Sequence, residues 1–480
     1  MADVLHIAQG SLRGTTIDGI TAYLGVPYAA PPFGELRFAA PAPPEPWDGV
    51  RDATGFGPTV PKADYVDMYV PLFPEVVVPG EECLNLNVWT PDGSGLPVLV
   101  WIHGGAFTNG SNSVPEYDGT SFARHGIVVV SVNYRLGAEG FVYLDGAPAN
   151  RGLLDQVAAL RWVRKNIEAF GGDPDRVTVA GQSAGAWCVQ TLLSMPQAKG
   201  LFQRAIAQSG GAQHYLNADQ GRLVAGELAA RLSVEPTRDD FAKLDPAVVA
   251  VAVRDLIGEI QGAPDPAKWG DLALSSQPYA PTVDGEVLEN PPLPFLDPDV
   301  ALLTGTTAEE ARLILVASGA IGLIDETLLL QSASAYGLGA DDVDIYRKAR
   351  PDATPGDLLS AIVSDWYFRI PAIRSAEAHG ADSWVYQFDW ASPTLGSGHG
   401  VDLPFAFHTL DTPGLAPRLG DEPPVAIADT FHHVWVNFIK FGDPGWARYG
   451  NDRTVGVVNE SVVSVSDPGG AERVLWEGVR

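Results

Sequence analysis

Short apolar runs rich in β-branched residues recur through the first two thirds of this chain, with helical patterns between them. The runs lie at Val98–Ile102, Gly126–Val132, Arg176–Ala180, Ala205–Ala207 and Val300–Leu303. A run such as GIVVVSV, apolar almost throughout, is typical of a strand buried on both faces. Strands and helices in this alternation predict an α/β fold, a mostly parallel sheet with helices on both faces.

The clearest helical pattern lies between Gly152 and Gly171. Apolar residues recur there at spacings of three and four, as on one face of an amphipathic helix, at Leu153, Leu154, Val157, Leu160, Val163, Ile167 and Phe170. The glycine pair Gly171-Gly172, followed by Asp173-Pro174, is expected to end this helix.

Two later stretches, from about Asn217 to Lys268 and from about Arg312 to Asp382, consist mostly of helical and loop patterns. In parallel sheets such insertions cover the carboxyl ends of the strands, where ligands bind. The sequence contains no internal repeat, low-complexity tract or long linker. We therefore predict a single domain over residues 1–480.

The charge balance is strongly acidic. The 480 residues include 59 Asp and Glu against 31 Lys and Arg, a formal net charge of −28. Such a field repels phosphate backbones and anionic lipids, so we expect neither a nucleic acid nor a membrane as partner. We interpret the charge as a solvated surface; the alternative is a field that attracts cationic substrates. No window approaches the roughly 20 apolar residues of a membrane span.

Two cysteines, Cys83 and Cys188, are too few for a disulfide framework, and reduced thiols are expected. The first residues lack the basic segment and apolar stretch of a signal peptide. We therefore expect a cytoplasmic protein.

Residues Gly181-Gln182-Ser183-Ala184-Gly185 spell G-x-S-x-G between the strand pattern RVTVA and a helical pattern. In that context the motif predicts a strained elbow, which small neighbours permit and which lifts the serine Oγ clear of the sheet. The N–H of Ala184 would then lie at a helix N-terminus, directed at a developing oxyanion. The motif predicts that Ser183 is a nucleophile; the alternative is a glycine-rich structural turn.

Several longer motifs resemble the type-B carboxylesterase/lipase family of α/β-hydrolases, most closely its bacterial para-nitrobenzyl esterase-like branch. They span most of the chain, at Tyr23–Ala29, Leu36–Phe38, Glu81–Trp89, Asn133–Gly137, Gly152–Gln156, Phe170–Pro174 and the elbow itself. The resemblance implies an α/β-hydrolase fold whose helical insertions cover the active site. It also implies a Ser-His-acid triad that needs no metal or cofactor.

His103-Gly104-Gly105-Ala106-Phe107 follows an early strand. Residues with little or no side chain let backbone N–H groups approach a substrate carbonyl closely. By resemblance, the amides of Gly105 and Ala106 complete an oxyanion hole with Ala184, and Gly104 supports the loop. In the family, the His103 position orients this loop rather than transferring protons.

A serine nucleophile needs a base, and the chain offers nine histidines. The best candidate is His399, because flanking glycines place it on a loop able to reach the elbow. The family carries its catalytic histidine in the same Gly-His-x-x-x-x-x-Phe context. His408, in an apolar element, is the competing candidate, whereas His432 and His433 lie in a predicted C-terminal helix where packing is the expected role.

The triad acid should lie between Ser183 and His399 in this fold. Glu309 and Glu310 follow the strand ALLTG, where the family has Gly-x-x-x-Asp-Glu-Gly with the second acid catalytic. We therefore assign Glu310, although Glu309 and Ala311 depart from the pattern. The alternative is a pair of solvated acids that open a helix. Ser209 matches a family serine that hydrogen-bonds to the acid; a strand-end turn is the competing interpretation.

Together these residues predict a serine esterase that hydrolyses uncharged carboxylic esters of small molecules through a covalent acyl-enzyme. A carbamate or aryl-ester hydrolase of the same family is an alternative, and a non-catalytic binding relative is a rival from another class. Tryptophans such as Trp101 and Trp187 could form a cage for a quaternary ammonium ion, but core packing is the favoured interpretation. Both a monomer and a homodimer are compatible with the sequence.

Overall fold

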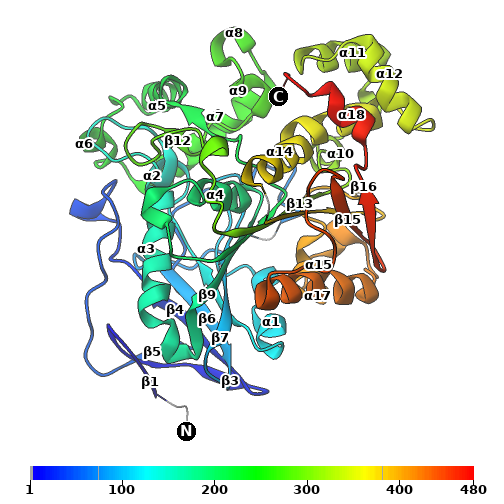
Figure 1. The fold of residues 1–480 in the computed structure, drawn as a ribbon. Coiled ribbons are helices and arrows are strands. Elements are labelled where there is room, and N and C mark those ends of the chain that lie inside the picture. Colours follow the sequence, from blue (N-terminus) through cyan, green and yellow to red (C-terminus); the bar gives the residue numbers. More distant parts are fainter. Residues whose placement is uncertain (1–3, 74, 381, 480) are drawn as a thin grey trace.

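The computed structural model describes residues 4–73, 75–380 and 382–479, and a large central sheet dominates it (Figure 1). The sheet has 11 strands in the order β16-β15-β14-β13-β10-β9-β7-β8-β6-β4-β3. Their bounds are β3 (Thr15–Ile17), β4 (Ile20–Pro27), β6 (Asn85–Pro91), β7 (Leu96–Ile102), β8 (Val128–Val132), β9 (Gly172–Gln182), β10 (Arg204–Gln208), β13 (Ala301–Thr307), β14 (Ser383–Phe388), β15 (Thr454–Val458) and β16 (Val462–Ser466).

The middle of this sheet, from β8 to β15, is parallel throughout. Both edges are antiparallel, where β3, β4 and β6 form one flank and β16 the other. Two small sheets accompany it, one of β1 (Val4–Ile7), β2 (Gly10–Arg13) and β5 (Val50–Asp52), the other of β11 (Leu216–Asn217) and β12 (Thr282–Val283). The predicted mostly parallel sheet is confirmed.

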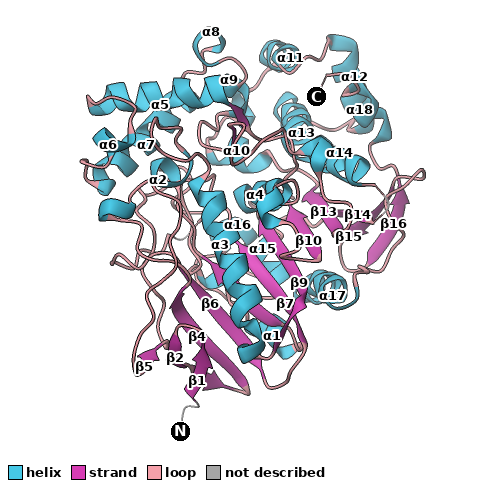
Figure 2. Cartoon of the chain, turned by 60° about the vertical axis from the view of Figure 1, so that its left-hand side comes forward, coloured by secondary structure: helices cyan, strands magenta, loops and turns pink. Residues whose placement is uncertain are grey.

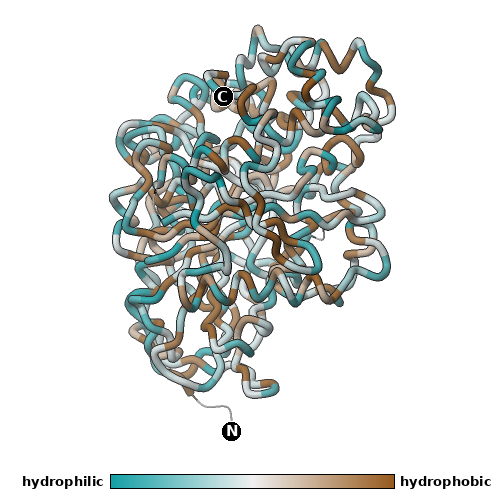
Figure 3. The backbone as a smooth tube through the Cα atoms, turned by 45° about the vertical axis from the view of Figure 1, so that its right-hand side comes forward, coloured by the Kyte–Doolittle hydropathy of each residue, from teal (hydrophilic) through white to brown (hydrophobic). Residues whose placement is uncertain are grey.

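Helices pack on both faces of the sheet (Figure 2). Strand β7 shows why, because its alternate residues enter different cores. Val98, Val100 and Ile102 share a core with α3 (Arg151–Asn166) and α4 (Ala184–Leu192). Leu99 and Trp101 share the other core with α1 (Thr120–Arg124), α15 (Leu403–Phe407) and α17 (Val425–Phe441). The hydropathy colouring is brown along these central strands and mostly teal on the outer loops (Figure 3).

The helix predicted before Gly171 is α3, continued by a 3₁₀ turn at Ile167–Phe170. Its apolar face is buried as expected, with Leu154 half-buried. Gly171 ends it with φ +81°, a left-handed conformation that suits glycine. Asp155, on the same helix, pairs with Arg135 at 2.7 Å, and both side chains are fully buried. That ion pair joins two of the family-like motifs.

The two predicted insertions are helical. The first comprises α5 (Ala218–Leu232), α6 (Arg238–Phe241), α7 (Pro246–Gly262) and α8 (Pro266–Trp269), and α9 (Leu272–Ser275) follows just beyond its predicted end. The second comprises α10 (Arg312–Ala317), α11 (Glu326–Ala335), α12 (Ala340–Ala349), α13 (Pro355–Ser364) and α14 (Ile370–His379). The remaining helices include α2 (Gly137–Phe141), α16 (Ala416–Leu419) and α18 (Gly470–Leu475). Most insertion helices gather at the top of Figure 1, away from the sheet that contains β1. In the described part of the chain, no helix has both the length and the apolarity that crossing a bilayer requires.

Candidate active site

Ser183 occupies a sharp turn between the end of β9 at Gln182 and the start of α4 at Ala184. Its φ of 57° and ψ of −124° are strained for a residue with a side chain. The turn is tight because both flanking glycines touch backbone. A Cβ at Gly181 would lie 2.5 Å from Gly185, and one at Gly185 would lie 2.1 Å from the carbonyl oxygen of Ile102. The elbow therefore requires glycine on both sides of the serine.

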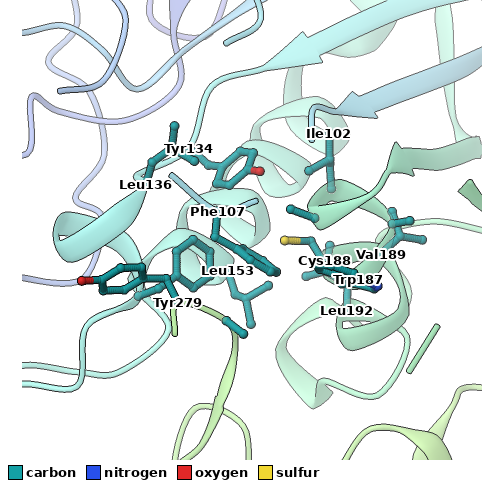
Figure 4. Close-up of a cluster of buried hydrophobic side chains, with 14 of the residues drawn as sticks. Ile102, Phe107, Tyr134, Leu136, Leu153, Trp187, Cys188, Val189, Leu192 and Tyr279 are labelled. Carbon is teal, nitrogen blue, oxygen red and sulfur yellow. The ribbon is translucent and has the colours of Figure 1, made fainter. Parts of the chain in front are cut away.

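The loop after β7 runs beside this elbow. Ala106 and Phe107 have φ of 54° and 63°, and Gly105 has φ of 109°. A Cβ at Gly104 would lie 2.8 Å from the carbonyl oxygen of Gln182. The Phe107 ring stacks on Trp187 of α4 at a centroid distance of 5.7 Å, and Figure 4 shows these rings side by side in the core. The strained loop is thus held directly against the elbow.

His103 anchors the start of the same loop. It is fully buried and stacks on Tyr134, whose hydroxyl donates to the His103 carbonyl at 2.7 Å. His103 Nδ1 lies 2.8 Å from the carbonyl oxygen of Gly104. Burial lowers the pKa of His103 to about 3, so the ring stays neutral at physiological pH. It contacts the loop backbone, as the resemblance implied for this position.

Three backbone N–H groups around Ser183 have no hydrogen-bond acceptor among the described residues. They are the amides of Gly105, Ala106 and Ala184. The Ala184 amide opens α4, whose dipole favours negative charge at that end. These donors are available to a substrate oxygen.

His399 and Glu310 meet at the carboxyl end of β13. His399 Nδ1 lies 2.5 Å from Glu310 Oε2, and the backbone N–H of His399 donates to the Glu310 carbonyl at 3.1 Å. The Glu310 side chain is buried, with 1% exposed, and its Oε1 accepts from the Thr307 amide at 2.8 Å. A charged, buried carboxylate can therefore orient the imidazole and stabilise its cationic form.

The competing residues lie elsewhere or bind other groups. Glu309 is 43% exposed, and its carboxylate accepts from the Ser397 amide at 3.1 Å rather than from His399. His408 pairs with Asp429 at 2.8 Å on α17. His432 is buried on α17 with its Nδ1 2.7 Å from the Ala406 carbonyl, as expected for a packing role.

Ala311 replaces a family glycine without distorting the turn. Its φ of −72° and ψ of −6° are open to any residue, and its amide donates to Ser364 Oγ at 2.9 Å. Helix α10 begins only at Arg312, so Glu309 and Glu310 lie in the preceding turn rather than within the helix. The structure does not match the alternative of solvated acids that open a helix, because Glu310 is buried and both acids precede α10.

Comparison with known proteins identifies the family. The model of the carboxylesterase family matches residues 1–455. This chain belongs to the carboxylesterase family. It is 36% identical to a para-nitrobenzyl esterase of Bacillus subtilis (strain 168), covering 98% of this chain and 97% of the relative. It is 34% identical to a phenmedipham hydrolase of Pseudarthrobacter oxydans, covering 92% and 90%.

Solved structures of carboxylesterases are also similar to this chain over nearly its whole length. The crystal structure of the Geobacillus stearothermophilus carboxylesterase EST55 at pH 6.2 matches with a TM-score of 0.84 and 36% identity, covering 98% of this chain and 99% of that one. A para-nitrobenzyl esterase structure matches with a TM-score of 0.82 and 32% identity, covering 99% of each chain. The α/β-hydrolase fold and the assignment as a carboxylic ester hydrolase are thereby shown.

Three residues of this carboxylesterase lie around His399 that sequence patterns did not single out. Gln182 Nε2 lies 3.0 Å from His399 Nε2. Phe368, from the second insertion, packs on the imidazole at a centroid distance of 4.8 Å. Asp402 is fully buried nearby, where burial and then the charge of Glu310 raise its pKa to about 7. Gln182 and Asp402 lie within quoted motifs, but nothing in those motifs revealed what their side chains contact.

Ser209 does not bind the acid in this structure. It occupies the turn after β10 with φ 58°, and its amide donates to the Gly305 carbonyl at 2.8 Å. Its buried Oγ has no hydrogen-bond partner among the described residues. The resemblance-based role is therefore not supported by a contact. The described residues also include no group of three or more His, Cys, Asp or Glu side chains arranged to hold a metal ion.

Proposed function

We propose that this carboxylesterase hydrolyses uncharged carboxylic esters with Ser183 as nucleophile, His399 as general base and Glu310 as the acid that orients it. The observation that supports this most is the 2.5 Å contact between His399 Nδ1 and Glu310 Oε2, made at the same sheet edge as the Ser183 elbow. Family membership supports the reaction class.

In the first half-reaction, Ser183 Oγ attacks the ester carbonyl carbon while its proton passes to His399 Nε2. The carbonyl oxygen becomes an oxyanion, which the amides of Gly105, Ala106 and Ala184 stabilise; each such donor contributes about 10²–10³ in rate. The C–O bond to the alcohol then breaks, and the alcohol leaves with the proton from His399. Water repeats the sequence on the acyl-enzyme and releases the carboxylic acid. Gly104 supports this arrangement, because its lack of a side chain lets the loop lie close to the carbonyl of Gln182.

The substrate class is a neutral ester of a small molecule, because every group in the proposed mechanism acts on a carbonyl and none requires a charged partner. Aryl carbamates pass through the same tetrahedral chemistry, and their hydrolysis is the second candidate activity. The similarity to a protein named phenmedipham hydrolase supports including such compounds in a test panel.

The test is hydrolysis of p-nitrophenyl acetate by the purified protein, followed by a panel of esters and aryl carbamates compared by kcat/KM. We expect a burst of p-nitrophenol equal to the enzyme concentration when deacylation is slower than acylation. A purified, folded protein that hydrolyses no member of the panel would contradict the proposal.

We also propose a cytoplasmic location. The support is that Cys83 and Cys188 are both buried and unpaired, the state expected in a reducing compartment. We propose no nucleic-acid partner, because the net charge of −28 opposes phosphate binding.

A further inference from the structure

Gln182 and His399 are 217 positions apart in the chain, yet their Nε2 atoms are 3.0 Å from each other. The Nδ1 atom of His399 faces the carboxylate of Glu310. An ionised carboxylate has no hydrogen to donate, so it can only accept a hydrogen bond. Nδ1 therefore carries the hydrogen, and Nε2 of the neutral ring holds a lone pair. The Gln182 amide must be the donor between the two nitrogens.

The same lone pair has to accept the proton of Ser183 during acylation. Among the described residues, no hydrogen bond joins Ser183 Oγ to His399, although Ser183 is the next residue after Gln182. One lone pair does not serve two donors well at once. In this structure His399 is thus hydrogen-bonded to the side chain of Gln182 and not to the hydroxyl of Ser183.

We propose that Gln182 is a positioning residue for the catalytic base. Its amide donates a hydrogen bond to Nε2 of His399, which fixes the orientation of the ring and disfavours its protonation. When an ester binds, this hydrogen bond breaks and Nε2 becomes free to accept the proton of Ser183. This inference rests on the proposed function, because it assigns His399 as the base.

The surroundings explain why a neutral amide suits this position. Two acids act on the imidazole: Glu310, from the turn after β13, binds Nδ1, and the buried Asp402, at the start of α15, interacts with the ring through its charge. Phe368 covers the ring, and a Cβ at Gly400 would lie 3.7 Å from both Gln182 Nε2 and Phe73. A hydrogen bond donated to the neutral ring disfavours its protonation, whereas a further carboxylate would favour it.

The test is the pH dependence of kcat/KM for p-nitrophenyl acetate, which reports ionisations of the free enzyme. Gln182→Glu keeps the shape but replaces the donor with a charge, and should move the acid limb to higher pH by about one pH unit. Gln182→Asn has a shorter side chain whose amide no longer reaches Nε2. Because the lost hydrogen bond favoured the neutral ring, the same limb should move to higher pH by roughly half a pH unit. Gln331→Glu adds the same charge on the exposed face of α11 and should leave the profile unchanged.

If the Gln182→Glu and Gln182→Asn profiles both overlay that of an active wild type, Gln182 does not control His399 and the inference is wrong. If Gln182→Glu does not fold, the Gln182→Asn profile decides by the same criterion. A wild-type protein that neither hydrolyses the ester nor reacts with a fluorophosphonate overturns instead the proposed function on which the inference depends.

Discussion

His399 Nδ1 lies 2.5 Å from Oε2 of Glu310, and the backbone of His399 also donates to the carbonyl of Glu310. The side chain and the main chain of one residue therefore bind the same partner across 89 positions of sequence. Glu309 binds the Ser397 amide, so it braces the histidine loop without touching the ring. Two adjacent acids thus have distinct contacts, which makes their roles separable by mutation.

Replacing Glu310 by Gln should lower kcat by roughly 10²–10⁴, because it removes the charge that stabilises the imidazolium. Glu309→Gln is the matched control and should stay within about tenfold of wild type, since the side chain is 43% exposed and its partners among the described residues are the Ser397 amide and Arg312. Steady-state kinetics with folding checked by circular dichroism decides between them. A crippled Glu309→Gln beside an active Glu310→Gln would reverse the assignment.

Removing the buried partner of Arg135 should destabilise the fold. Asp155→Ala leaves a buried guanidinium without its carboxylate, and should cost about 3–5 kcal/mol in the free energy of unfolding. Asp175→Ala removes a partner of Arg164 on the surface and should cost less than about 1 kcal/mol. Urea denaturation measures both; equal losses would show that burial of the Arg135 pair has no special weight.

Asp402 should make stability depend on pH. Its pKa is raised to about 7 in the folded protein, so the fold favours the protonated form, and the contribution of Asp402 to stability falls as pH rises from about 4 to 7. Asp402→Asn should therefore gain stability relative to wild type between pH 5 and pH 8, by a few kcal/mol at roughly 1.4 kcal/mol per pKa unit. The exposed Asp411→Asn should show no such trend. A constant difference between wild type and Asp402→Asn at both pH values would contradict the prediction.

Cys83 and Cys188 should both titrate as thiols in denatured, unreduced protein. The family resemblance implies that a disulfide partner for Cys83 would stand near position 60, where this chain has the buried Val60 instead. Burial raises the pKa of each thiol to about 12, so neither should react with a thiol reagent in the native protein. Ellman's reagent before and after denaturation checks this; finding no thiol after denaturation would mean that a disulfide forms.

Local patterns predicted the fold and the elbow because their causes are local. The apolar runs of the strands and the G-x-S-x-G spacing are local patterns, although the glycine at position 185 is required by the distant carbonyl of Ile102 on β7. The edges of the sheet and the extension of β9 back to Gly172 were not predicted, since they depend on pairing with distant strands. The division into one domain over residues 1–480 stays a prediction.

The candidate site also contains residues that the sequence predicted and contacts that only the folded chain shows. His399 and Glu310 were assigned through a resemblance, and their contact is visible only in the folded chain. The Gln182 contact depends on a side-chain conformation across 217 positions, and Phe368 reaches the imidazole from an insertion whose packing no motif encodes. Ser209 shows the converse, a motif match whose expected contact the fold does not make.

The most direct measurement of the central claim is mass spectrometry of the intact, folded protein after reaction with a fluorophosphonate. The elbow exposes the Ser183 hydroxyl beside three free amides, so we predict one adduct per chain, located on Ser183 by peptide mapping. Ser183→Ala should take up no label and lose about 10⁴–10⁶ in kcat. An adduct on another serine, or full activity in Ser183→Ala, would contradict the account.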